Sequence, residues 1–439
     1  MKLTPEDITR LLVALALILS AAHALGYVFT RLGQPRVIGE ILGGLALGPT
    51  GLGAMFPELA RAIFPEGGPV PLVLDATYQL GLLLLMFAAG AEIRAAFHPG
   101  ERRTVTAVTV TGTLLPLLVG FGLFSTWRPE GIRGSAGTDA SLLLVFAIAI
   151  AVTSIPIISR ILFDLGVLET SFARIVLAVA VIEDVILYVL LAVALGLGSQ
   201  GPSLHGLPEI LSLDPSGIAS VAYHGFATVG FLVVALMVGP WLYRRILKFR
   251  YNVLKRGSAV AFQLVFMFGA VVAALLLGVV ALFGAFVAGI VVASSSAKGA
   301  ARAREEIRSF SFAFFIPVYF GVVGLRLDLI REFDLLFFLA FFALACTAKW
   351  ASVYLGARLA GEDRGASVNL SFALNARGGP GIVLASVALD ARIISETFYS
   401  TLVLLAIITS LLAGLWLERV VRSGGTLRRG PSGAAQTDP

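Results

Sequence analysis

The chain has 439 residues, of which 58% are hydrophobic and only 14% charged, whereas an ordinary soluble domain carries roughly 25% charged residues. This composition excludes a soluble globular protein and indicates one that lies largely within a lipid bilayer. The formal net charge of +6 does not indicate nucleic-acid binding, because no arginine-rich segment interleaves with aromatic residues. Basic loops retained on one face of a membrane explain the charge.

Apolar runs recur along the whole chain, and each reaches the roughly 20 residues that a helix needs to cross a bilayer. The runs are continuously apolar rather than alternating, which favours helices over a β-barrel. We predict about 13 membrane segments, at approximately 8–30, 35–50, 72–93, 104–126, 140–163, 171–198, 217–243, 257–275, 277–296, 308–325, 334–357, 365–389 and 395–419.

The basic residues of the loops alternate strongly between the two sides of this arrangement. Of the 33 lysines and arginines, 23 fall on one side and 8 on the other, while Lys349 and Arg377 fall inside segments. Because basic loops are retained in the cytoplasm, we expect the N-terminus outside and the C-terminus in the cytoplasm. The short polar stretch 421–439 is expected to be a disordered tail.

An internal repeat links the two halves of the chain. Residues 39–44 in the second segment are similar to 284–289 in the ninth, and 87–94, ending the third, are similar to 320–328, ending the tenth. The halves begin an odd number of segments apart, so they cross the membrane in opposite directions. Inverted repeats of this kind are typical of secondary transporters, although small residues at helix contacts also produce such matches.

Two adjacent acids, Glu183 and Asp184, lie in the middle of the segment 171–198. Ionisable residues at that depth are costly and mark candidate functional sites. Neighbours on a helix point about 100° apart, so one acid can face a structural partner and the other an ion. Burial and a nearby like charge favour the neutral form of a carboxyl group, which lets protons compete with cations. The alternative is a buried ion pair without a transport role.

Lys349 lies in the middle of the segment 334–357 and is the natural counter-charge for the acidic pair. A buried lysine either pairs with a carboxylate or loses its proton, and both outcomes suit a proton-coupled carrier. The alternative is that its long side chain reaches back to the membrane surface.

Helix-breaking residues interrupt one segment in each half. The segment 140–163 contains Thr153, Ser154 and Pro156, and a proline removes a backbone donor and disfavours helix at the residue before it. Irregular backbone at membrane depth is tolerated only inside protein or beside a water-filled cavity. For Pro156 alone, a packing kink is the alternative.

The segment 365–389 contains Asn375, Arg377 and Gly378, followed by a glycine-proline-glycine run. An ordinary lipid-facing helix cannot carry this cluster in mid-membrane. Such breaks expose backbone groups that can bind ions, and half-helix dipoles that face one another.

Together these features resemble the monovalent cation:proton antiporter superfamily, in the branch of bacterial sodium/proton antiporters and potassium efflux systems. The resemblance spans nearly the whole chain and rests on residues 37–49, 82–92, 153–162, 183–184, 284–289, 315–328 and Lys349.

The resemblance implies an all-α membrane fold of about 13 transmembrane helices, with inverted repeats and two crossed discontinuous helices. It further implies a homodimer in which a core moves like an elevator against a dimerisation domain. The membrane domain would occupy 1–420, with core segments at about 104–198 and 334–419, dimerisation segments at about 8–93 and 257–325, and a linker helix at about 217–243.

The resemblance also implies the roles of the buried polar residues. Asp184 would bind a cation or a proton alternately, with help from Thr153, Ser154 and backbone carbonyls, while Glu183 would form a switchable pair with Lys349. Sodium-type relatives carry two aspartates or Asn-Asp here, and potassium-type relatives often carry Gln-Asp. The Glu-Asp pair of this chain therefore leaves open the choice among Na⁺, K⁺ and Li⁺, and the charge stoichiometry.

The expected function is exchange of Na⁺ or K⁺ for H⁺ across the cell inner membrane. The alternatives are a cation channel and a sodium-coupled organic-solute symporter of the same fold. No cofactor, nucleic acid or nucleotide-binding domain is expected. We do not expect an enzyme, since no nucleophile–base pair or metal cluster is evident.

Overall fold

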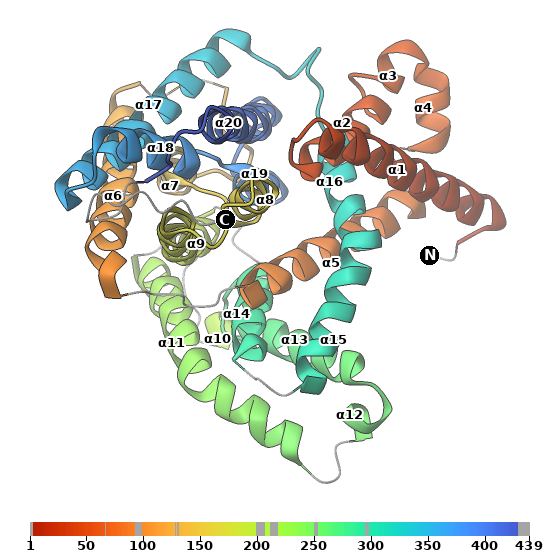
Figure 1. Ribbon diagram of the computed structural model, residues 1–439. Coiled ribbons are helices and arrows are strands. Elements are labelled where there is room, and N and C mark those ends of the chain that lie inside the picture. The colour runs from red at the N-terminus through yellow and green to blue at the C-terminus, as the bar shows by residue number, and fades with distance from the viewer. Residues whose placement is uncertain are drawn as a thin grey trace. The chain divides into compact units, whose positions relative to one another are not determined.

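The structure is a computed structural model of the chain (Figure 1), and it describes residues 3–65, 67–92, 99–127, 129, 131–198, 207–210, 218–249, 253–294 and 298–428. Within these ranges the regular structure is helical, and the strand-type pairing is a single isolated bridge between Arg133 and Ile394. The predicted all-α fold is confirmed.

Eleven helical stretches of the described residues are long and apolar enough to cross a membrane. Nine of them centre on the helices α1 (Pro5–Arg31), α2 (Arg36–Leu47), α5 (Pro69–Glu92), α6 (Arg102–Trp127), α9 (Ser171–Gly196), α11 (Ile218–Lys248), α13 (Ala259–Leu276), α17 (Leu335–Ala360) and α20 (Glu396–Arg422). The other two are composite, formed by α15 (Lys298–Phe310), the π-helical turn η2 (Ser311–Phe315) and α16 (Ile316–Leu325), and by α18 (Arg364–Leu374) and α19 (Gly378–Asp390).

Two shorter apolar helices, α7 (Asp139–Ala151) and α14 (Ala281–Ala293), fall in the remaining predicted segments. The division between the segments predicted at 257–275 and 277–296 lies at a turn where Gly278 has a φ of +71°. The remaining described helices are short: α3 (Leu52–Met55), α4 (Pro57–Ile63), α8 (Ile155–Asp164), α10 (Leu207–Ile210), α12 (Val253–Gly257) and the 3-10 turn η1 (Pro99–Glu101).

The two predicted breaks are present. Helix α7 ends at Ala151 and α8 begins at Ile155, because Val152 (φ −62°, ψ 142°) and Ser154 (φ −125°, ψ 110°) are extended. Pro156 lies in the first turn of α8, where its missing N–H removes no helical hydrogen bond. Helix α18 ends at Leu374 and α19 begins at Gly378.

The chain divides into two compact units. Unit 1 is drawn from 1–28, 36–94 and 195–331, and unit 2 from 29–35, 95–194 and 332–439. Unit 1 therefore contains α1, α2, α5 and α11 to α16, whereas unit 2 contains α6 to α9 and α17 to α20.

In unit 1, α2 packs against α16 and α5 against α14 (Figure 1), and glycines bring the facing backbones of these helices close together. A Cβ on Gly324 of α16 would lie 1.9 Å from the Ile41 carbonyl oxygen of α2, and a Cβ on Gly90 of α5 would lie 2.0 Å from the Phe286 carbonyl oxygen of α14. Ile41 and Phe286 hold the same place in the two repeated stretches, 39–44 and 284–289. The repeated sequences therefore make equivalent contacts, as the predicted inverted repeat requires.

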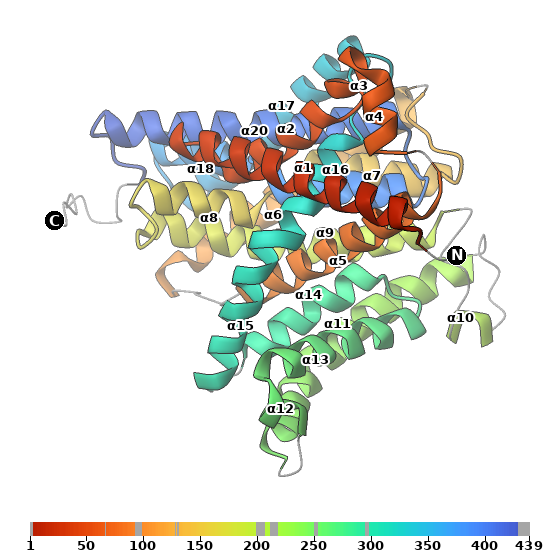
Figure 2. The same ribbon diagram turned by 90° about the vertical axis from the view of Figure 1, so that its right-hand side faces the viewer.

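Unit 2 buries its interrupted helices more completely than its continuous ones. Every residue of α19 from Gly378 to Ser386 is buried, as is every residue of α7 from Val145 to Ala151. Figure 2 shows α18 beside α20, which contact each other within this unit. A helix that is apolar on all sides belongs in the interior of a membrane protein, and this burial surrounds both breaks with protein.

The beginning of the polar tail differs from the prediction. The sequence predicts disorder from residue 421, but α20 continues to Arg422 and the side chain of Leu427 is buried. An apolar side chain and a buried ion pair hold this stretch against unit 2, as described below. The part of the predicted tail after Arg428 lies outside the described residues.

The glycine contacts of unit 1 predict a position-specific loss of stability. We expect Gly324→Ala and Gly90→Ala each to lower the free energy of unfolding by about 1–3 kcal/mol, because the facing backbone must move away. Gly269→Ala in α13 is the matched control, since nothing lies within 4 Å of its added Cβ. Thermal unfolding of the detergent-purified variants measures the difference, and equal midpoints for all three would contradict the prediction.

Candidate functional site

The two helix breaks of unit 2 meet each other. The Thr153 hydroxyl in the first break lies 2.8 Å from the Leu374 carbonyl oxygen at the end of α18, and the Gly379 amide of α19 donates to the Ser154 hydroxyl oxygen (3.2 Å). A Cβ on Gly378 would lie 2.1 Å from the Ile157 side chain, and its φ of +22° also favours glycine. The predicted crossing of two discontinuous helices is therefore present.

Five predicted site residues are withdrawn from solvent, and hydrogen bonds join three of them, Thr153, Glu183 and Lys349. Thr153, Ser154, Glu183 and Lys349 are fully buried, and Asp184 is 2% exposed. They come from the first break, from the middle of α9 and from the middle of α17. Residues far apart in the sequence therefore form one polar centre inside an apolar unit.

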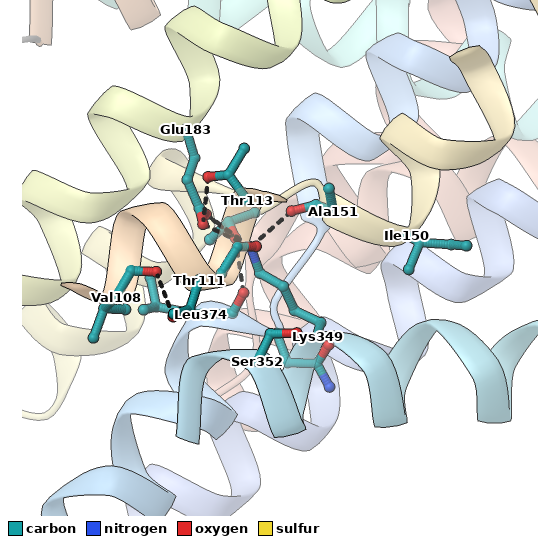
Figure 3. Close-up of polar contacts among 12 residues, drawn as sticks. Val108, Thr111, Thr113, Ile150, Ala151, Glu183, Lys349, Ser352 and Leu374 are labelled. Atoms are coloured by element: carbon teal, nitrogen blue, oxygen red, sulfur yellow. Dashed lines mark hydrogen bonds and ion pairs between the residues drawn. The ribbon is translucent and has the colours of Figure 1, made fainter. Parts of the chain in front are cut away.

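Lys349 is bound on every N–H of its ammonium group (Figure 3). Its Nζ lies 2.8 and 2.9 Å from the two Glu183 carboxylate oxygens, 2.9 Å from the Gly112 carbonyl oxygen and 2.7 Å from the Ala151 carbonyl oxygen. The Glu183 carboxylate also accepts a 2.6 Å hydrogen bond from Thr153. The charged pair is therefore fully hydrogen-bonded, as a buried ion pair must be to be tolerated.

Lys349 and Arg377 donate hydrogen bonds to the carbonyl oxygens at the C-terminal end of α7. The last carbonyls of a helix have no partner within it. Arg377 donates to the Ala149 (3.2 Å) and Ile150 (3.1 Å) carbonyl oxygens, and Lys349 donates to that of Ala151. Positive charges at a helix C-terminus also interact favourably with its dipole. The break at 152–154 is thus stabilised by two buried cations from other segments.

Arg377 also organises the second break. It donates to the Asn375 side-chain oxygen (2.7 Å) and to the Ala345 carbonyl oxygen of α17 (2.6 Å), and it is 1% exposed. Asn375 and Arg377 therefore hold the irregular backbone between α18 and α19 against its neighbours.

Asp184 differs from its neighbour Glu183. Its Oδ1 atom is buried and has no hydrogen-bond partner among the described residues. A buried carboxylate oxygen without a partner carries a large free-energy cost, which a bound proton or a bound cation would relieve. The centre therefore combines a closed pair, Glu183–Lys349, whose charges are hydrogen-bonded to each other, with an open carboxyl group, Asp184, whose Oδ1 has no partner among the described residues.

Two groups of this centre are not predicted from the sequence. They are the Gly112 carbonyl, which binds Lys349, and Thr113, whose hydroxyl lies 3.4 Å from Glu183 Oε1. The available signal was the set of five threonines in the first half of α6, an unusual density of polar side chains for a membrane helix: Thr104, Thr106, Thr109, Thr111 and Thr113.

The sequence model of the transmembrane sodium/hydrogen exchanger family matches residues 14–423. Among named relatives, Cation/H(+) antiporter 20 of Arabidopsis thaliana is 28% identical over 91% of this chain and 47% of its own length. The Na(+)/H(+) antiporter of Enterococcus hirae is 27% identical over 92% of this chain and 96% of its own length. K(+)/H(+) antiporter 1 of Saccharomyces cerevisiae is 28% identical over 92% of this chain and 46% of its own length.

The chain thus spans about half the length of the plant and yeast relatives and nearly all of the bacterial one. Among solved structures, the sodium proton antiporter MjNhaP1 from Methanocaldococcus jannaschii has the same fold. Its TM-score is 0.62 at 15% identity, over 96% of this chain and 98% of that one. With eleven candidate spans among its described residues, the chain is a multi-pass membrane protein, and it belongs to the transmembrane sodium/hydrogen exchanger family.

Proposed function

We propose that the protein exchanges a monovalent cation, Na⁺ or K⁺, for H⁺ across the inner membrane. The observation that carries the proposal is the open, buried carboxyl group of Asp184 beside the closed Glu183–Lys349 pair at the crossing of two broken helices. The relatives support it, since they are named as cation/H⁺, Na⁺/H⁺ and K⁺/H⁺ antiporters.

In the proposed cycle, Asp184 carries either a cation or a proton. The deprotonated carboxylate attracts the cation, and hydroxyl oxygens of Thr153 and Ser154, together with exposed backbone carbonyls, complete its oxygen ligands. A proton neutralises the carboxyl group and removes the attraction that holds the cation. Each release of one ion therefore requires the arrival of the other.

Glu183 and Lys349 serve as the switch of this cycle. We propose that Glu183 leaves Lys349 when a cation enters. Lys349 would keep two acceptors, the carbonyl oxygens of Gly112 and Ala151, so the ammonium group would stay hydrogen-bonded after Glu183 turns away. Opening still costs free energy because Lys349 loses its counter-charge, and the cation that enters beside the carboxylates is proposed to offset that cost.

Alternating access is proposed to come from movement of unit 2 as one body against unit 1. The support is that every residue of the site lies in unit 2, while the chain clusters into two separate units. Unit 1 would supply the contacts of a homodimer. The distribution of basic loops supports an outer N-terminus and a cytoplasmic C-terminus.

Replacement of Asp184 tests the proposed site directly. We expect Asp184→Asn to abolish cation-driven proton release, because an amide cannot exchange a proton for a cation. Purified protein in liposomes with a pH-sensitive dye would report the exchange when Na⁺ or K⁺ is added. Asp75→Asn, which changes an exposed acid in unit 1, should retain activity. Full exchange by Asp184→Asn would overturn the proposed site.

Replacement of either partner tests the Glu183–Lys349 pair. Lys349→Met or Glu183→Gln alone should lower the free energy of unfolding by about 3–5 kcal/mol, because one buried charge loses its partner. The double variant should recover much of that loss and yet show no coupled exchange. Thermal unfolding and the liposome assay test both parts, and additive destabilisation in the double variant would argue against the pairing.

The cation and the proton should compete for Asp184. Since one carboxyl group holds either ion, lowering the pH should raise the apparent KM for the cation and leave the maximal rate at saturating cation unchanged. Initial rates in liposomes at several pH values, with no organic solute present, would test this. A flux that does not saturate would favour a channel, and an absolute need for a solute would favour a symporter.

A further inference from the structure

The segment that follows α20, residues 423–428, folds back against unit 2. The chain turns at Gly424, whose φ of +70° suits a residue after a helix end. The Gly424 and Gly425 amides then donate to the carbonyl oxygens of Val421 and Val420, at 3.0 Å each. This turn directs the next residues along α18 and α20.

Leu427 anchors the segment in the core of unit 2. It is 7% exposed and belongs to an apolar cluster with Leu370 of α18 and Leu417 of α20. Its carbonyl oxygen accepts a 3.0 Å hydrogen bond from the Asn369 side-chain amide of α18. The Asn369 side-chain oxygen in turn accepts from the Trp416 indole at 3.0 Å. Asn369 therefore joins the tail and α20 to the middle of α18.

Arg428 makes the second attachment. Its guanidinium donates two hydrogen bonds to the Glu362 carboxylate, at 2.9 and 2.8 Å, and the two side chains are only 10% and 7% exposed. Such two-point pairs are strong and geometrically specific. The carboxylate of Glu362 raises the pKa of Arg428 above its usual value. Glu362 also accepts a 2.7 Å hydrogen bond from Thr104 in the first turn of α6.

The segment contacts Asn369 of α18 and Glu362, and Glu362 follows the end of α17 and accepts from Thr104 of α6. These three helices contribute to the polar centre. Helix α6 provides the Gly112 carbonyl, α17 provides Lys349, and α18 ends at the Leu374 carbonyl that binds Thr153. Asn369 lies only about one and a half turns before Leu374. A shift of α18 at the tail would therefore move the backbone oxygens at the break.

We propose that residues 423–428 act as a clamp that positions the cation site from the end of unit 2. Leu427 and Arg428 are its positioning residues. Leu427 is bound by Asn369, and Arg428 is bound by Glu362. The clamp rests on the proposed exchange function and adds a determinant of its apparent affinity. Loss of the clamp should raise the apparent KM for the cation several-fold and shift the pH profile, with little change in the maximal rate.

A charge-exchange series in liposomes tests the clamp. We expect Arg428→Glu and Glu362→Arg each to raise the apparent KM for Na⁺ and K⁺, and the double variant to restore it toward the original value. The matched control is Arg422→Glu, whose guanidinium pairs with Glu418 at the exposed end of α20 and should leave the KM unchanged. An unchanged KM in Arg428→Glu, or no recovery in the double variant, overturns the proposal.

Trypsin cleavage separates failure of the clamp from failure of the proposed function. Because Arg428 is buried against Glu362, the unmodified protein should be cut slowly after Arg428, and Glu362→Gln should speed the cut. This result supports the docked segment even if no preparation exchanges cations, whereas equal cleavage rates overturn the clamp. The fragments are identified by mass, so the readout does not depend on transport.

Discussion

Unit 2 depends on hydrogen-bond donors for the last carbonyl oxygens of α7, at the helix break. Three carbonyl oxygens, those of Ala149, Ile150 and Ala151, would face apolar protein without partners if Lys349 and Arg377 were absent. Water is not available at membrane depth to replace a missing donor. The two buried cations are therefore structural groups first, and their position explains how an interrupted helix persists in the interior of unit 2.

The same arrangement leaves the Asp184 Oδ1 atom without a hydrogen-bond partner among the described residues, which supports the proposed role of Asp184. Lys349 is occupied by Glu183 and by two carbonyl oxygens, and Arg377 is occupied by backbone and by Asn375. Among the buried side-chain atoms without a hydrogen-bond partner in the described residues, Asp184 Oδ1 is the one carboxylate oxygen. A site for exchange needs such an open group, because a fully paired carboxylate gains little from binding an ion.

Close glycine contacts occur in both units, and unit 2 adds hydrogen bonds between its helix breaks. The backbone N–H and C=O groups of a continuous helix are hydrogen-bonded within the helix. In unit 1, close glycine contacts join α2 to α16 and α5 to α14. Interrupted helices leave N–H and C=O groups at the break without partners in the same helix. In unit 2, hydrogen bonds therefore join the breaks, the buried cations and the tail. This difference suits the proposed roles of unit 1 as a frame and unit 2 as the carrier of the site.

The place of the membrane segments follows from the sequence, because apolar length is a local property, although two of the 13 predicted segments contain only shorter apolar helices among the described residues. The sequence also determined the two breaks, through Pro156 and Gly378, and the candidate charges, because ionisable residues in mid-membrane are rare. Tertiary structure decided which groups meet: that Arg377 caps α7, that Gly112 binds Lys349, and that Arg428 reaches Glu362. These partners lie between 66 and 237 residues apart, and only the packing of the helices brings such distant atoms within hydrogen-bonding reach.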